Sequence, residues 1–131
     1  MTGEPISDFA AIEALAQRYF DALYDGDVEA FAALFHPAAR LYSAGGGTTT
    51  IMDVPAYLAV VKGRVPPRVR RDRREDTVLS IARPTPTTAH LRVRELFLPK
   101  RFTDELTLMK EGGAWRIVSK VWDFEIINEG V

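Results

Sequence analysis

The spacing of hydrophobic residues changes once along this chain, near residue 75, and that change limits the folds it can adopt. Before residue 75, apolar residues recur every three or four positions, as on one face of a helix. After it, apolar and polar residues alternate, as in strands with one buried face. Because helices come first and strands follow, the pattern predicts an α+β domain with three helices packed on an antiparallel sheet.

The N-terminal helices carry recognisable start and stop signals. Ser7 or Asp8 can cap the first helix, and Gly26 can take a left-handed conformation past its end. Asp27 and Asp53 can cap the second and third. The expected helices lie within residues 7–26, 27–36 and 53–63, with a short strand at 39–43 and a glycine-rich loop at 43–50.

Four strands are expected after residue 75, and their register follows from two turns. Hairpin turns at Pro99–Lys100 and Gly112–Gly113 place one apolar face against the helices. This register puts Val121 on that inner face and Lys120 on the outer face. It also leaves three large side chains pointing outward: Leu96, Leu98 and Trp122.

Two acidic residues, Glu95 and Asp104, interrupt the apolar inner face and are expected opposite one another. Two carboxylates in a low-dielectric site cannot both ionise cheaply, so the pKa of one should rise, which suits acid–base catalysis. The alternative is that both lie near the wet end of the sheet and pair with Arg101 or another arginine.

Composition excludes several functions. The 131 residues include no cysteine, so disulfides and thiolate metal sites are excluded. The net charge is -1, and the arginine-rich segment 64–74 has no interleaved aromatic residue, so we expect an extended, solvated loop and no nucleic-acid partner. An anionic ligand or a dimer contact is the alternative role of this segment. No apolar run reaches membrane-spanning length and no signal peptide is present, so we expect a cytoplasmic protein without a membrane partner.

The two histidines lack the spacing of metal ligands, so no metal is expected. His36 precedes Pro37 at the end of the second helix, where capping or packing is favoured over catalysis. His90 falls among arginines on the outer face.

Two stretches, "QRYFDALYDGDVEAFAALFHPAARLYS" and "FTDELTLMKEGGAWRIVSKV", resemble the nuclear transport factor 2-like (NTF2-like) superfamily, which includes SnoaL-like and ketosteroid isomerase-like proteins. Within it, they are most similar to the small bacterial group described as "Putative lumazine-binding". The resemblance implies a single domain over residues 1–131 with a cystatin-like cone, in which three helices and a curved antiparallel sheet enclose a pocket. It also implies a homodimer, and the outward Leu96, Leu98 and Trp122 place the expected contact on the charged outer sheet face or its edges. No cofactor is expected.

In ketosteroid isomerase, a tyrosine donates a hydrogen bond to the developing oxyanion, and Tyr19 matches that tyrosine. Where the isomerase has its general-base aspartate, this chain has Ser43 or Tyr42. Where the isomerase has its second acid, this chain has Glu105 or Thr107. Because no base stands at the first position, steroid-type isomerisation is disfavoured.

The resemblance and the helix phase together predict a pocket beside Tyr19. Its expected lining comprises Tyr19, Phe31, Phe35, Tyr42, Met52 and Tyr57, although these aromatic residues could instead be core. The first functional hypothesis is a dimeric pocket protein that binds a small apolar or aromatic molecule. The alternative is a cofactor-independent isomerase, dehydratase or cyclase in which Tyr19 acts with Asp104 and Glu95. A scaffold with a closed pocket is a third possibility.

Overall fold

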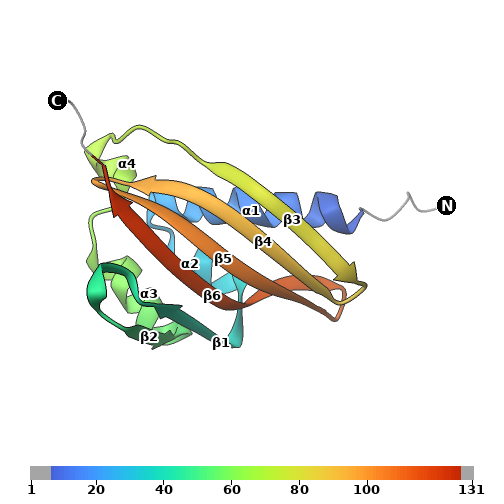
Figure 1. Ribbon diagram of the computed structural model, residues 1–131. Coiled ribbons are helices and arrows are strands. Elements are labelled where there is room, and N and C mark those ends of the chain that lie inside the picture. Colours follow the sequence, from blue (N-terminus) through green and yellow to red (C-terminus); the bar gives the residue numbers. More distant parts are fainter. Residues whose placement is uncertain (1–6, 128–131) are drawn as a thin grey trace.

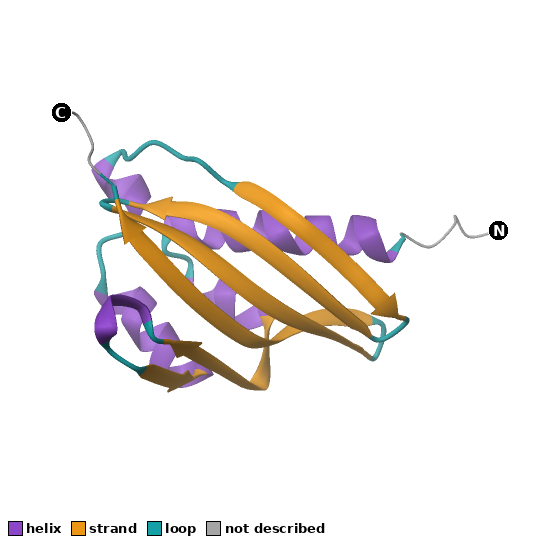
Figure 2. Ribbon diagram, viewed as in Figure 1, coloured by secondary structure: helices purple, strands orange, loops and turns teal. Residues whose placement is uncertain are grey.

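The computed structural model describes residues 7–127 as a six-stranded sheet with helices on one face (Figure 1). Helices α1 and α2 cross the inner face, α3 closes one end, and the outer face is left uncovered (Figure 2). The helices are α1 (Asp8–Asp25), α2 (Val28–Leu34), α3 (Val54–Gly63) and α4 (Pro67–Arg70), with a 3-10 turn η1 (Gly45–Gly47). The strands are β1 (Phe35–Ser43), β2 (Thr50–Asp53), β3 (Thr77–Thr85), β4 (Thr88–Phe97), β5 (Lys100–Glu111) and β6 (Ala114–Ile126).

The three predicted helices are confirmed, and each begins at a capping side chain. The Ser7 hydroxyl accepts from the Ala10 amide at 3.1 Å. Asp27 and Asp53 do the same for α2 and α3, at 3.0 and 2.9 Å. Gly26 ends α1 with φ 67°, a left-handed conformation that glycine adopts without strain.

The sheet has the order β2-β1-β6-β5-β4-β3, and its strands are antiparallel except that β1 runs parallel to β6. It is therefore mixed, whereas the sequence predicted an antiparallel one. Three local predictions change too: β1 begins at Phe35, the loop at 43–50 leads into β2, and the segment expected as an extended loop contains α4. The hydrogen bonds of β1 and β2 come from strands distant in sequence, so the local pattern does not reveal them.

The β4–β5 hairpin has a register two residues away from the predicted one. Phe97 pairs with Lys100, so the turn is Leu98–Pro99, and Glu95 pairs with Phe102 while Asp104 pairs with Val93. Glu95 and Asp104 are therefore diagonal neighbours rather than opposite one another. Because strand side chains alternate with a period of two, the shift leaves both on the predicted inner face. Both are buried, with 1% and 0% of their surface exposed.

The β5–β6 pair contains an irregularity that reverses the predicted faces of β6. Thr107 pairs with Ser119, but Leu108 pairs with Ile117, so Val118 is an extra residue. Such a bulge shifts the alternation of every residue beyond it. Lys120 is consequently buried at 5% exposure and Val121 is 45% exposed, so their predicted faces were wrong. Trp122, predicted outward, packs partly buried against the core.

Asp8, the first residue of α1, connects the N-terminal end of this helix to the sheet. Its carboxylate accepts from Lys110 Nζ at 2.9 Å and from Trp115 Nε1 at 3.1 Å, and it pairs with Arg83. The Lys110 hydrogen bond is the main reason that the pKa of Asp8 falls to about 2. The predicted inner position of Trp115 is confirmed, since it belongs to the core. Among residues 7–127, no helix is both long and apolar enough to cross a membrane.

Candidate functional site: a pocket above a buried ion pair

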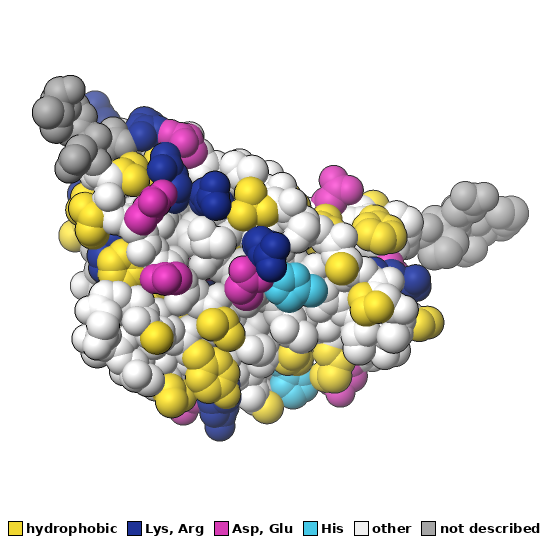
Figure 3. All heavy atoms as spheres, viewed as in Figure 1, with side chains coloured by type: hydrophobic (Ala, Val, Ile, Leu, Met, Phe, Trp, Pro, Cys, Tyr) yellow, Lys and Arg dark blue, Asp and Glu magenta, His cyan; other side chains and the backbone are white. Residues whose placement is uncertain are grey.

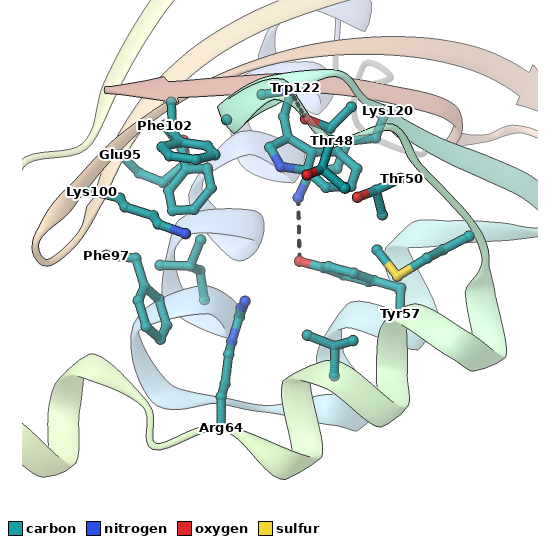
Figure 4. Close-up of a pocket in the computed structure, with 17 residues that line it drawn as sticks. Thr48, Thr50, Tyr57, Arg64, Glu95, Phe97, Lys100, Phe102, Lys120 and Trp122 are labelled. Carbon is teal, nitrogen blue, oxygen red and sulfur yellow. Dashed lines mark hydrogen bonds between the residues drawn. The ribbon is translucent and has the colours of Figure 1, made fainter. Parts of the chain in front are cut away.

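A pocket of about 420 Å³ opens between α3, the η1–β2 segment and the adjacent parts of β4, β5 and β6 (Figure 4). Aromatic side chains form much of its wall: Phe97, Phe102, Trp122 and Phe124. The rings of Phe102 and Phe124 lie 5.8 Å apart. Such rings offer flat apolar surface to a ligand.

The polar ends of several side chains enter the same space. In Figure 4, Tyr57 and Arg64 reach into it from the α3 side, and Lys100 and Lys120 from the sheet. Glu95 is the acidic residue of the lining. Few polar groups within an apolar wall are typical of small-molecule sites.

Lys120 is the buried cation of this pocket. Its Nζ lies 3.3 Å from the Tyr57 hydroxyl, to which it donates, and 3.8 Å from Asp104 Oδ2. The ammonium also lies 4.7 Å from the Tyr57 ring centroid and 5.4 Å from those of Tyr19 and Trp122. Burial alone would lower the pKa of Lys120, but the nearby charge of Asp104 is the main influence that opposes burial, so the pKa is raised and the group stays charged.

Asp104 lies beneath the pocket and joins Lys120 to Tyr19. The Tyr19 hydroxyl donates to Asp104 Oδ2 at 2.6 Å, a short bond of the charge-assisted kind. Burial, and then the charge of Asp104, raises the pKa of Tyr19 well above its usual value. Tyr19 is therefore a permanent hydrogen-bond donor, committed to Asp104 within the protein.

Glu95 lines the pocket and faces the carboxylate of Asp104. Burial, followed by the charge of Asp104 and a hydrogen bond to it, raises the pKa of Glu95 well above its usual value. Within residues 7–127, Glu95 Oε2 and Asp104 Oδ1 are buried atoms without another hydrogen-bond partner. A proton held by Glu95 makes one of these two acceptors a donor, so the site presents a neutral carboxylic acid.

Of the six residues predicted to line the pocket, two line it and four lie elsewhere. Met52 and Tyr57 do line it. Tyr19, Phe31 and Phe35 lie in the core behind it and form edge or tilted ring contacts with one another or with Tyr57. Tyr42 is 39% exposed, because Leu41 and Ser43 are the buried residues on either side of it in β1.

The predicted catalytic residues are brought together, although only one of them reaches the pocket. Glu95 is in the lining, whereas Tyr19 and Asp104 are fully buried below it. Sequence reasoning missed Lys100 and Lys120, and it noticed Arg64 only as part of the arginine-rich segment 64–74. The bulge at Val118 concealed Lys120, and Lys100 lies where β5 adjoins a loop, without a local pattern to mark it.

The histidines lie outside this pocket. Of the two roles expected for His36, capping or packing, it does not cap α2, since Phe35 is the C-cap and His36 Nδ1 accepts from the Ala38 amide at 3.0 Å in β1. His90 lies 3.0 Å from Glu105 on the outer face, as predicted. Over residues 7–127, no group of three or more His, Cys, Asp and Glu side chains could hold a metal ion.

The family model described as "Putative lumazine-binding" matches residues 7–123. The chain belongs to this family. Among curated proteins, none matches the sequence.

Solved structures of similar proteins agree with the family assignment. An NTF2-like protein of unknown function from Silicibacter pomeroyi is 26% identical, with a TM-score of 0.76 over 89% of this chain and 95% of that one. A ketosteroid isomerase-like protein from Erwinia carotovora atroseptica is 15% identical, with a TM-score of 0.71 over 90% and 96% of the two chains. A cystatin-like fold protein from Burkholderia xenovorans is 19% identical, with a TM-score of 0.69 over 91% and 92%. These similarities confirm the NTF2-like superfamily and the cystatin-like fold.

We expect Glu95→Gln to stabilise this family member increasingly as the pH rises. Well below pH 4.5, Glu95 is protonated in both the folded and the unfolded state, so the substitution changes little. Above that pH the unfolded chain loses the proton while the native protein keeps it, which costs the wild type up to about 1.4 kcal/mol per pH unit. Urea titrations at pH 5, 6 and 7, with the exposed Glu13→Gln as control, measure the difference. A stability difference that is constant or falls with pH contradicts a protonated Glu95.

Proposed function

We propose that this protein binds a small, flat ring compound that carries an oxygen acceptor. The observation that carries this proposal is the meeting of the Tyr57 hydroxyl and the Lys120 ammonium, 3.3 Å apart, between aromatic walls. Lys120 has three N–H donors, of which one is used by Tyr57. A ligand oxygen would receive another of them, together with the hydroxyl proton of Tyr57.

The dimensions and the family description support the same ligand class. A volume of about 420 Å³ lies within the range of about 300–1,000 Å³ usual for small-molecule sites. The family description names lumazine, a flat bicyclic compound with ring carbonyl groups. Trp122 and the phenylalanines offer faces for such a ring, and Tyr57 with Lys120 offers donors for its carbonyl oxygen.

Tyr57→Phe tests the role of the hydroxyl, since it keeps the ring contacts with Phe31 and Phe35. Isothermal titration calorimetry would compare lumazine and quinolin-4-one with quinoline, which lacks the oxygen. We expect the oxygen-bearing rings to bind the wild type more tightly than quinoline does. The substitution should weaken their binding about 3- to 10-fold, the effect of losing one neutral hydrogen bond of roughly 0.5–1.5 kcal/mol.

Tyr24→Phe is the matched control, because Tyr24 donates to the Asp72 carbonyl at 2.6 Å and does not line the pocket. The proposal is contradicted if lumazine and quinolin-4-one bind the wild type and Tyr57→Phe with equal affinity, or if the wild type binds neither compound.

A second candidate function, a dehydratase, is favoured by the protonated Glu95 in the pocket lining. Glu95 could donate its proton to a leaving hydroxyl, and the resulting carboxylate could accept the proton lost from the neighbouring carbon. The reaction would release water and restore Glu95. Glu95, rather than Tyr19, would act on the substrate, because Glu95 lines the pocket whereas Tyr19 is fully buried below it.

Dehydration of 3-hydroxy-1-tetralone to 1-naphthol provides a fluorescent assay for this second function. A dehydratase should form 1-naphthol faster than buffer does, and Glu95→Gln should remove most of the excess rate. A wild-type rate equal to that of buffer contradicts the dehydratase and leaves the binding function as proposed.

We also propose that the protein forms a homodimer through the outer sheet face. Three exposed apolar residues lie side by side across β2, β1 and β6: Ile51, Tyr42 and Val121. Figure 3, which views this face, has hydrophobic side chains over β1, β2 and β6 and a band of charged side chains beyond them. This row replaces the dimer contact that the sequence predicted around Leu96 and Trp122, since Leu96 is buried and Trp122 lines the pocket.

Val121→Lys should convert the proposed dimer into a monomer, because it places a charge in the middle of the row. Light scattering after gel filtration at micromolar concentration would report the mass. Val69→Lys, at an exposed position in α4, is the control and should leave the mass unchanged. A wild-type protein of monomeric mass contradicts the dimer.

A further inference from the structure

Two cations at the mouth of the pocket have no anionic partner in the described part of the chain. Arg64 and Lys100 line the pocket, and neither forms an ion pair within residues 7–127. The Nη2 atom of Arg64 is buried there without any hydrogen-bond partner. A buried guanidinium N–H without an acceptor is costly, so this atom indicates a missing acceptor.

Other cations close to this region are already neutralised. Lys120 lies 3.8 Å from Asp104, and Arg70 lies 3.1 Å from Asp72. Arg74 pairs with both Asp76 and Asp21. The acid that lines the pocket, Glu95, faces Asp104 and forms no ion pair with Arg64 or Lys100 within residues 7–127. The mouth therefore carries unbalanced positive charge directly beside the space for a ligand.

Both cations are held in place by aromatic rings. The Arg64 guanidinium lies 4.5 Å from the Phe97 ring centroid, and Lys100 Nζ lies 4.2 Å from that of Phe124. Arg64 follows α3 and Lys100 begins β5, yet their ends point into the same space in Figure 4. A planar guanidinium fixed in this way can donate two parallel N–H bonds to a carboxylate.

We propose that the ligand of this pocket carries a carboxylate, which Arg64 and Lys100 bind at the mouth while the ring oxygen contacts Tyr57 and Lys120. This inference rests on the proposed binding function and narrows its ligand class to ring compounds with one acidic substituent. A phosphate could meet the same cations. The carboxylate is preferred because the planar fork of the Arg64 guanidinium matches a planar anion, to which it can donate two parallel N–H bonds.

A matched pair of compounds tests the charge alone. Lumazine-6-carboxylate and lumazine-6-carboxamide share ring and size, and at neutral pH they differ mainly in the charge of the substituent. Calorimetry with the wild type should show the carboxylate binding about 10-fold or more tightly than the carboxamide, and this ratio should fall with added salt. Arg64→Gln and Lys100→Gln should each reduce the ratio, and the double variant should bring it near one.

Two further variants protect the test against trivial outcomes. Arg64→Lys keeps the charge but loses the planar fork, so its ratio should lie between those of the wild type and Arg64→Gln. Lys62→Gln removes an exposed charge from α3, the helix that precedes Arg64, and should leave the ratio of carboxylate to carboxamide affinity at its wild-type value. Circular dichroism would establish that each variant is folded before its ratio is compared.

The outcomes separate the inference from the function on which it rests. If the wild type binds neither compound, the proposed binding function fails. If it binds both equally, that function stands and the carboxylate inference is overturned. A phosphate monoester of 6-hydroxymethyl-lumazine that binds more tightly than the carboxylate would assign the mouth to phosphate and also overturn the inference.

Discussion

The rest of the candidate site depends on the ion pair between Lys120 and Asp104, buried under the pocket. Lys120 is 5% exposed and Asp104 fully buried, so each charge needs the other to remain in the interior. Lys120 Nζ lies 3.8 Å from Asp104 Oδ2. The Lys120 ammonium also donates to the Tyr57 hydroxyl, and the Asp104 carboxylate accepts from the Tyr19 hydroxyl. Removing one partner would leave an uncompensated charge, which typically costs about 3–5 kcal/mol. The pair thus fixes the position of both tyrosines.

The same pair determines the chemistry of the pocket above it. The negative charge of Asp104, added to burial, keeps the proton on Glu95, so the pocket presents a neutral acid. Tyr57 and Lys120 offer donors next to it. The unbalanced cations Arg64 and Lys100 lie at the mouth rather than at the base. The pocket is thereby polarised, with neutral donors and a balanced pair inside and positive charge at the entrance, between walls of aromatic rings.

Much of the fold could be predicted from the sequence because its signals are local. The caps at Ser7, Asp27 and Asp53 mark the helices, and the alternation in β4 and β5 places Glu95 and Asp104 on the inner face even though the predicted turn was wrong. Strand side chains alternate with a period of two, so a register shift of two residues leaves each side chain on the same face of the sheet. The fold family followed from the resemblance of nearly the whole chain.

The parts that could not be predicted depend on distant pairing. The extra residue Val118 turns Lys120 into the interior, and nothing in the local sequence distinguishes it from a regular strand residue. The short strand β2 exists because β1 provides its hydrogen bonds. The candidate site was therefore predicted through its acids and Tyr57, whereas Lys120 became visible only with the sheet register and Arg64 and Lys100 only with the pocket itself.

Burial beside the Asp104–Lys120 pair raises the pKa of Glu95, and we therefore expect a neutral carboxylic acid at physiological pH. Infrared difference spectroscopy between the wild type and Glu95→Gln at pH 7 measures this state directly. We expect the wild type to show the carbonyl band of a protonated carboxyl group that the variant lacks. Loss of a carboxylate band in the variant, without loss of a protonated-acid band, would contradict the account.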